Sequence, residues 1–151
     1  MQTSCVSTQK ALEMPELSAG LVGTLDLTVA EKNCTVRGDY HIFSTPELVL
    51  LAELTAIEAL KPYLQDGQSS VGTRVDIAHS AATLLGQTLT SKAVVKEVDR
   101  RRVLFEIEVR DEIDEVATGT HERFIVDLDR FGSRLDAKAA AVAALPQRNV
   151  A

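Results

Sequence analysis

The alternation of apolar and polar positions predicts one strand near the start of the chain. From residue 21 to residue 29 every second position is apolar or small, and the positions between them are mostly polar. This period of two is typical of a half-buried strand. The positions that would face the core are Leu21, Gly23, Leu25, Leu27 and Val29. Residues 1–19 and 31–43 show no sustained period, so we expect a loose N-terminal arm and an irregular segment there.

A long apolar helix is predicted to follow. Ser44-Thr45-Pro46-Glu47 is typical of a helix start, because a hydroxyl residue precedes a proline at the first helical position and an acid stands in the first turn. The helix should run to about residue 64. Nearly every position from 48 to 60 is apolar or small, and a helix that is apolar all round is a buried helix.

Four further strands are expected between residues 71 and 127. They are 71–83, 87–99, 102–110 and 116–127. The third has the clearest alternation, and its apolar face consists of Val103, Phe105, Ile107 and Val109. The links between these strands are short, which permits antiparallel neighbours but no crossover helices. An alanine-rich run predicts a last helix near residues 135–145.

The predicted order is therefore one strand, one long buried helix and four long antiparallel strands. A single sheet can bury such a helix only by curling around it, and its free edge then calls for a partner. This is the hotdog fold, an α+β fold in which a curved antiparallel sheet wraps a long central helix, usually in a dimer. We expect an arm at residues 1–19, a hotdog domain at 20–131, a C-terminal helix and tail at 132–151, and a homodimer.

The composition is that of an ordinary globular protein, with 45% hydrophobic and 25% charged residues among 151. A chain of this length forms one domain with a core of its own. The formal net charge of −6 argues against non-specific binding to nucleic acid or to anionic membranes. It also does nothing to attract a polyanion such as coenzyme A, so a site for one must gather Lys and Arg locally.

The cysteines, the histidines and the N-terminus indicate a cytoplasmic protein without a metal. Cys5 and Cys34 are too few for a disulfide framework, and we expect free thiols in a reducing compartment. His41, His79 and His121 do not have the spacing of metal ligands. No segment reaches the ~20 apolar residues of a membrane span, and the N-terminus has no signal-peptide pattern.

Glu53 is the first candidate for chemistry. It is the only charged residue between Glu47 and Glu58, in the middle of the apolar helix. Burying a carboxylate is costly unless the group is paired or neutralised. A structural glutamate that points at a crevice or pairs with an arginine would explain it, but isolated buried carboxylates more often serve a function.

His79 is the second candidate, because strand parity places it with Val75 and Ile77 on the face toward the helix. Taken alone, a histidine on an apolar face is more often a hydrogen-bonded core residue than a catalyst. Glu53 in the same helix–sheet layer changes this interpretation, since a carboxylate and an imidazole there could orient each other and act as acid or base.

Thr45 has an ordinary explanation as a helix N-cap, worth about 1 kcal/mol. The functional alternative is a hydroxyl at a helix N-terminus, where free backbone N–H groups favour a polarised oxygen. Eight residues of helix separate Thr45 from Glu53 by about 12 Å of rise and ~80° of rotation. The two side chains therefore cannot touch within one subunit, and a shared site needs a substrate that spans them or a dimer interface.

Arginines supply weaker candidates. Arg123 shares a strand face with His121, and it could hold a carboxylate or phosphate or pair with the strand acids. The run Asp99-Arg100-Arg101-Arg102 is typical of a solvated turn, and contact with phosphates is the alternative.

From residue 44 to residue 131 the chain resembles the thioesterase family that includes fluoroacetyl-CoA thioesterase. The resemblance is carried by STPELVLLAELTAIEALKPYL, VGTRVDIAHSAAT, EVDRRRVLFEIEVRD and GTHERFIVDLDRF, in the family's order and spacing. It implies a catalytic Thr just before the helix, a Glu on it and a His on the next strand, assisted by a Gly on that strand and an Arg on the last strand. These positions fall on Thr45, Glu53, His79, Gly72 and Arg123. An acyl-CoA-type substrate is implied, and no cofactor is expected.

Two departures indicate a general acyl-CoA thioesterase instead of the fluoroacetyl-specific branch. The fluoroacetyl-specific members have Gly after the Thr, whereas this chain has Pro46. The aromatic residue that gates fluoroacetyl selectivity a few positions upstream is absent, with Asp39 and Tyr40 in that region. The acyl group itself is not set by the pattern, because it depends on how residues 31–43 cover the pocket.

The resemblance implies hydrolysis near a dimer interface, with the thioester carbonyl at the helix N-terminus. Backbone N–H groups there or at Gly72 would stabilise the oxyanion. Glu53 would act as nucleophile or as general base for water. Thr45 would position the reacting groups or relay a proton, and His79 would polarise or protonate the thiolate leaving group. Two alternatives stay open: a hotdog hydratase or dehydratase for enoyl thioesters, and a non-catalytic protein that binds an acyl ligand.

Overall fold

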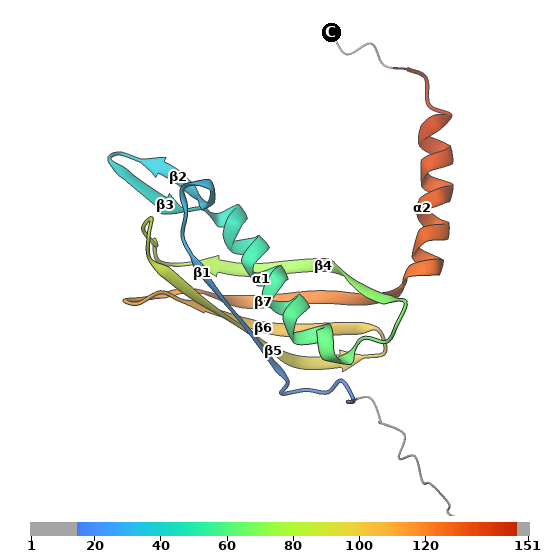
Figure 1. Cartoon of the computed structure of the whole chain (residues 1–151), viewed down its shortest axis with the longest axis horizontal. Coiled ribbons are helices and arrows are strands. Elements are labelled where there is room, and N and C mark those ends of the chain that lie inside the picture. Colours follow the sequence, from blue (N-terminus) through green and yellow to red (C-terminus); the bar gives the residue numbers. More distant parts are fainter. Residues whose placement is uncertain (1–14, 148–151) are drawn as a thin grey trace, which may run out of the picture.

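A five-stranded antiparallel sheet curls around one helix in the computed structural model, which describes residues 15–147 (Figure 1). Neighbouring strands follow the order β1-β5-β6-β7-β4. Their bounds are Val22–Thr28 for β1, Gln68–His79 for β4, Thr88–Asp99 for β5, Arg102–Arg110 for β6 and Glu115–Asp127 for β7. The predicted wrapping of a helix by antiparallel strands is confirmed, and β6 begins and ends where its alternation predicts.

Helix α1, Thr45–Leu60, fills the concave face of the sheet. Gly23 of β1 permits a close approach, since a Cβ added there would lie 2.6 Å from the Cβ of Ala59. The buried hydroxyl of Thr55 lies 2.8 Å from that of Ser91 on β5. Small and hydroxyl residues thus let the helix pack closely against β1 and β5. Its other side faces β4 and β7.

The prediction that α1 is buried all round is wrong for one side of the helix. Leu50 is 49% exposed and Leu54 is 41% exposed in a single copy of the chain. Glu53 is half-buried, with 36% of its side chain exposed. Its carboxylate therefore lies at the border of the core, where it can meet both protein groups and an incoming ligand.

The segment expected to be irregular is in fact ordered. It forms the short 3-10 helix η1 (Glu31–Asn33) and a hairpin of β2 (Cys34–Arg37) and β3 (Tyr40–Phe43). The hairpin projects from the body, so most of its side chains are not buried and no hydrophobic period develops (Figure 1). Gly38, at φ +58°, makes its turn. The Asn33 amide, which donates to Glu47 of α1 at 3.1 Å, fixes its base.

Several element ends differ from the prediction. Helix α1 ends at Leu60 instead of about residue 64, because Pro62 follows in the 3-10 turn, and β4 begins at Gln68 instead of residue 71. Helix α2, Leu128–Ala143, continues directly from β7 and begins seven residues before the expected start, because Asp129 and Gly132 are poor helix formers that conceal its first turn. None of its residues is buried, and it projects away from the sheet (Figure 1). Strand β4 ends at His79 instead of residue 83, because the chain leaves the sheet there and Leu84 bridges to the hairpin.

The described residues also show a short helix after α1 and bear on the membrane, metal and cysteine expectations. After α1 a short 3-10 helix, η2 (Lys61–Tyr63), takes the chain out of the sheet's concave face. Between residues 15 and 147, helices are too short or too polar to cross a membrane, and His, Cys, Asp and Glu side chains form no group that could hold a metal ion. Cys34 is a free thiol, whereas Cys5 lies outside the described residues.

Candidate functional site

The five candidate residues form two separate clusters, and they come from α1, β4 and β7. The first lies where α1 begins and β4 ends. The hydroxyl of Thr45, the first residue of the helix, lies 2.9 Å from Nδ1 of His79, the last residue of the strand. Ser44 occupies the N-cap position, and its side chain makes no cap hydrogen bond. The Thr45 hydroxyl is therefore directed at an imidazole, and its explanation as an N-cap is wrong.

His79 faces the helix side of the sheet, as strand parity predicts. Its ring packs edge-on against Phe43, with 6.4 Å between the ring centroids. The second ring nitrogen, Nε2, is buried and has no hydrogen-bond partner within the described part of the chain. An unpaired buried polar atom costs about 1–3 kcal/mol, so native proteins contain few of them, and a role in catalysis is one of the reasons for which such an atom is kept.

A cavity of about 370 Å³ adjoins this first cluster. The β2–β3 hairpin forms one wall of the cavity and brings the positive charge of Arg37 to it. Thr45 at the start of α1 and His79 at the end of β4 also line the cavity. A volume of this size is at the lower end of small-molecule sites. The hydroxyl–imidazole pair therefore borders a space that can receive a small ligand.

The second cluster is an ion pair between α1 and β7. Nη1 of Arg123 donates to Oε2 of Glu53 at 3.2 Å, and the arginine side chain is only 4% exposed. Nε of Arg123 donates to the Ser70 hydroxyl at 2.9 Å, and Nη2 donates to the Ser70 carbonyl oxygen at 3.0 Å. A guanidinium fixed in this way holds the carboxylate beside it in one position. Of the two interpretations of Arg123, pairing with the strand acids is not observed in the described residues; the guanidinium holds a carboxylate, and that carboxylate belongs to Glu53 of the helix.

His121 supports Arg123 from the neighbouring position on the same face of β7. Its Nδ1 lies 2.8 Å from the Arg74 carbonyl oxygen and therefore donates, which leaves Nε2 to accept from Nη1 of Arg123 at 3.3 Å. Burial lowers the pKa of His121, and the charge of Arg123 lowers it further. The stability that depends on neutral His121 is thus complete above the ordinary histidine pKa and is lost as the pH falls through the lowered value.

A β-bulge in β4 turns Ser70 and Gly72 toward the same face as His79. The register with β7 shifts between Gly72 and Arg74, so Thr73 is the extra residue. Without the bulge, strict alternation would point Ser70 and Gly72 away from the helix. Ser70 could not be found from the sequence, because only this irregularity decides which way it faces.

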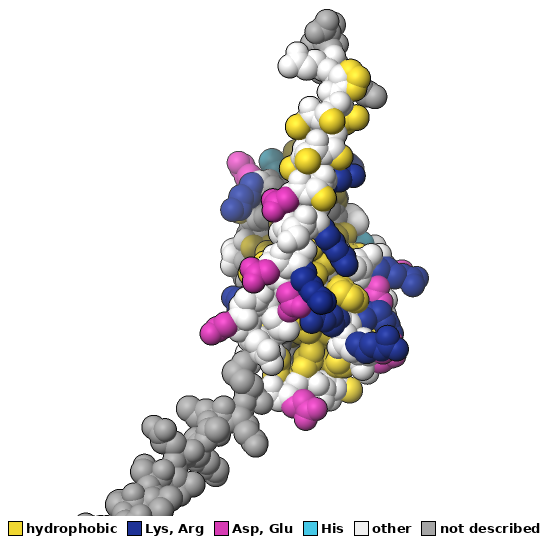
Figure 2. Space-filling view, turned by 90° about the vertical axis from the view of Figure 1, so that its right-hand side faces the viewer, with side chains coloured by type: hydrophobic (Ala, Val, Ile, Leu, Met, Phe, Trp, Pro, Cys, Tyr) yellow, Lys and Arg dark blue, Asp and Glu magenta, His cyan; other side chains and the backbone are white. Residues whose placement is uncertain are grey.

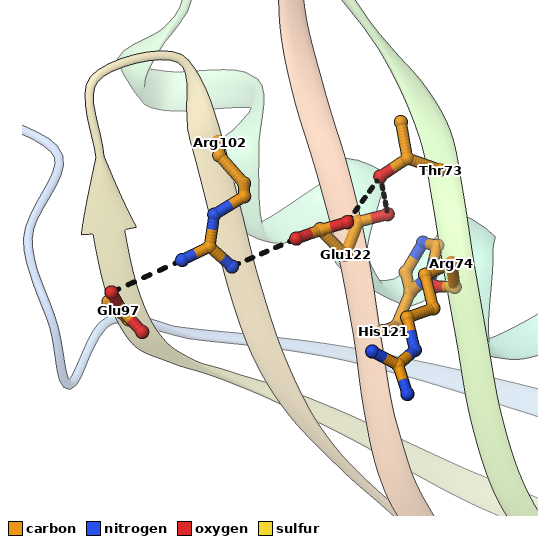
Figure 3. Close-up of polar contacts among 6 residues, drawn as sticks. All are labelled: Thr73, Arg74, Glu97, Arg102, His121 and Glu122. Carbon is orange, nitrogen blue, oxygen red and sulfur yellow. Dashed lines mark hydrogen bonds and ion pairs between the residues drawn. The ribbon is translucent and has the colours of Figure 1, made fainter.

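Polar contacts on the outer face of the sheet hold the bulge in place (Figure 3). The Thr73 hydroxyl donates to Oε2 of Glu122 at 3.0 Å. Arg102 donates to Oε1 of the same glutamate at 2.8 Å and to Glu97 at 3.2 Å. This chain of contacts links β4, β7, β6 and β5. Arg102 therefore belongs to a structural network and not to a solvated turn.

Gly72 leaves the space that the Glu53 carboxylate occupies. A Cβ added at this glycine would lie 2.8 Å from Oε2 of Glu53 and 3.3 Å from Nη1 of Arg123. The absence of a side chain thus lets the backbone of β4 approach the ion pair closely. The glycine is accordingly part of the second cluster.

The structure brings Thr45 to His79, and Gly72 and Arg123 to Glu53. It does not join the two clusters within one chain. The direct contact between Glu53 and His79 that the sequence allowed is not formed, because each group has its own partner in the described residues. A carboxylate held by an arginine and an imidazole held by a hydroxyl are groups that can accept and donate protons.

Comparison with known sequences identifies relatives of the chain. The profile of a family described as fluoroacetyl-CoA-specific thioesterase matches residues 25–129, a segment that contains all five candidate residues. A fluoroacetyl-CoA thioesterase of Streptantibioticus cattleyicolor is 36% identical over 101 residues, which cover 67% of this chain and 73% of that protein.

Solved structures resemble most of the described fold. A fluoroacetyl-CoA thioesterase superposes with a TM-score of 0.76 at 30% identity, over 82% of this chain and 98% of that one. A hot-dog-like protein from Thermanaerovibrio acidaminovorans superposes with a TM-score of 0.73 at 27% identity, over 80% and 91%. The predicted hotdog fold is thereby confirmed.

Proposed function

The chain belongs to the fluoroacetyl-CoA-specific thioesterase family and is an acyl-CoA thioesterase, and on that premise we propose that two copies of the chain build its active site together. In this proposal Thr45, Glu53 and His79 are the catalytic residues. Gly72 leaves room for the substrate beside the carboxylate, and Arg123, which is only 4% exposed, serves substrate binding by positioning that carboxylate. The observation that carries the proposal is the division of these residues into two clusters.

The distance between the clusters supports a shared site. About 12 Å of helix rise lies between Thr45 and Glu53. On β4, the seven residues from Gly72 to His79 span about 23 Å. A single thioester group is too small to touch both clusters of one chain. Each copy therefore holds one half of two different sites, and a second copy completes each of them.

Strand β4 offers the surface for that second copy. It lies at the edge of the sheet, is 12 residues long and pairs only with β7 in the described residues. A long free strand edge is a template for pairing with another chain. Antiparallel pairing of two β4 strands about a two-fold axis near residue 75 would set Gly72 opposite the partner's His79. Glu53 would then face the partner's Thr45 and His79.

The proposed chemistry uses both halves. The Glu53 carboxylate attacks the thioester carbonyl carbon or takes the proton of an attacking water molecule. Backbone N–H groups at the start of α1 donate to the developing oxyanion. His79, oriented by Thr45, gives a proton to the departing thiolate. If an acyl-enzyme forms on Glu53, a water molecule then hydrolyses its anhydride bond. In both routes the products are a free acid and coenzyme A, and the proton released by the water molecule restores the one that His79 gave to the thiolate.

We propose a general acyl-CoA substrate for this chain and no specialisation for fluoroacetyl-CoA. Asp39 lies at the turn of the β2–β3 hairpin, and Tyr40 is 63% exposed, so neither residue holds an aromatic ring over the first cluster. Pro46 stands in the first turn of α1, where the fluoroacetyl-specific members have Gly. The enzyme should therefore not prefer fluoroacetyl-CoA strongly over acetyl-CoA.

A panel of acyl-CoA esters, assayed for release of free thiol, tests the function. The panel should contain acetyl-, fluoroacetyl-, longer-chain and aromatic acyl-CoA, and we expect turnover of at least one ester that is lost in Glu53→Gln and in His79→Ala. Unchanged hydrolysis in both variants would contradict the assignment of Glu53 and His79 as catalytic residues. Tight acyl-CoA binding without hydrolysis would favour a binding protein, and addition of water to an enoyl-CoA would favour a hydratase.

Replacement of Gly72 by alanine is expected to lower kcat about tenfold without unfolding the protein. The methyl group would displace the ends of the Glu53 and Arg123 side chains and leave the backbone in place. A misplacement of about 1 Å at a catalytic group can cost up to ~10²-fold in rate. Steady-state kinetics and thermal melting measure the two effects. Gly132→Ala, where an added Cβ meets nothing within 4 Å, is the control. Unchanged activity in Gly72→Ala would contradict the role of this glycine.

A further inference from the structure

A pocket of about 240 Å³ lies where β7 passes into α2, and it shares no residue with either cluster. Arg101 reaches it from the β5–β6 turn, and Arg130 and Arg134 reach it from the first turns of α2. The rings of Phe124 and Phe131 complete its wall. Figure 2 shows Lys and Arg side chains gathered around the base of α2 on this face of the molecule.

The pocket is positive in a chain whose net charge is −6. Three guanidinium groups and the single carboxylate of Asp127 line it, which gives a net charge of +2. Asp127 pairs with Arg101 at 2.9 Å. Within residues 15–147 neither Arg130 nor Arg134 forms an ion pair. Two like charges four residues apart on a helix repel each other, so an anion in the pocket would relieve a cost that the chain otherwise bears.

The residue types in the pocket fit a phosphorylated nucleotide. A guanidinium group binds phosphate oxygens through two parallel N–H donors. An aromatic ring provides a face on which a base can stack. Phe124 is 42% exposed on its strand and is thus open to such contact. Coenzyme A carries both features, an adenine base and several phosphate groups.

We infer that this pocket holds the nucleotide phosphates of the acyl-CoA substrate, an inference that rests on the proposed function. Phe124 follows Arg123 in β7, so the pocket and the Glu53 cluster lie at the same end of the strand on its two faces. The flexible arm of coenzyme A that joins the nucleotide to the thioester would pass around the end of the sheet. The family profile ends at residue 129, so Arg130 and Arg134 lie outside the segment that it matches.

The double variant Arg130→Gln/Arg134→Gln tests this site in the full-length protein. We expect its KM for acetyl-CoA to rise about tenfold at low salt, which corresponds to the loss of roughly one charge-assisted contact, while kcat stays unchanged. Hydrolysis of acetyl-pantetheine, which has no phosphate, should be the same in the variant and the parent enzyme. Lys138→Gln, on the same helix but outside the pocket, is the control and should leave both substrates unaffected.

Three results would overturn the inference. They are an unchanged KM for acetyl-CoA in the double variant, an equal loss on acetyl-CoA and acetyl-pantetheine, and inhibition by inorganic pyrophosphate as strong as inhibition by adenosine 3′,5′-bisphosphate. If no thioester is hydrolysed by the parent enzyme, the proposed function fails separately. Calorimetry of coenzyme A binding then tests the pocket without catalysis. A tenfold higher Kd in the double variant supports the inference that the pocket holds the nucleotide phosphates, and an equal Kd refutes it.

Discussion

Replacement of Glu53 by glutamine is expected to lower kcat for acyl-CoA hydrolysis by about a thousandfold. Glutamine keeps the shape of the side chain, and its carbonyl oxygen can still accept the 3.2 Å hydrogen bond from Arg123. The amide can act neither as a base nor as a nucleophile, and loss of a general base costs ~10²–10⁴-fold in rate. Release of free thiol from the best substrate of the panel measures the change.

The control for this experiment is Glu58→Gln. Glu58 lies on the same helix and pairs with Lys61 on the surface, so its replacement should leave kcat unchanged. Thermal melting of both variants separates a chemical effect from unfolding. A folded Glu53→Gln enzyme that keeps more than a tenth of the parental kcat would rule out Glu53 as base or nucleophile.

Replacement of His79 by alanine is expected to lower kcat by about 10²–10³-fold, because it removes the group assigned to protonate the departing thiolate. It also deprives the Thr45 hydroxyl of its partner at 2.9 Å. The loss should depend on the leaving group. The thiolate of an acidic aryl thiol departs without a proton, so an aryl thioester should lose much less rate than the coenzyme A thioester. Comparison of the two substrates in the parent and the variant measures this difference.

His41→Ala is the matched control for the histidine, since His41 lies on β3 and outside both clusters. It should hydrolyse both thioesters at the parental rate. An equal loss on both leaving groups in His79→Ala would contradict the proton-donor role and would leave His79 as a structural partner of Thr45.

Local sequence predicts best the elements that have one face in the core and the other in solvent. Strand β6 is the clearest example, because its inward residues Val103, Phe105, Ile107 and Val109 are all buried, as the alternation predicts. The same pattern does not reveal the β2–β3 hairpin, because most of its side chains are not buried and no period can develop. It does not reveal the open side of α1 at Leu50 and Leu54 for a related reason. Apolar residues on a helix face indicate that this face is buried, but they do not indicate whether the same chain or a second chain buries it.

The sequence could identify the residues of the candidate site but not which of them are in contact. Glu53 stands out because it is a lone charge in an apolar helix, and parity directs His79 toward that helix. Their partners are far away in sequence: Arg123 lies 70 residues from Glu53, and Thr45 lies 34 residues from His79. Such pairs depend on how the whole sheet twists and on the bulge in β4, and no local pattern records either.

A mixed dimer tests the shared active site most directly. The Glu53→Gln chain and the His79→Ala chain would be co-expressed with different affinity tags, and the heterodimer would be isolated. If each site takes Glu53 from one copy and Thr45 and His79 from the other, the heterodimer has one intact site and one doubly altered site. We predict about half of the parental activity per dimer, although each variant alone is nearly inactive. A heterodimer as inactive as the two variant homodimers would contradict the shared site. Each chain would then contain all the catalytic residues of its own site, one of them altered.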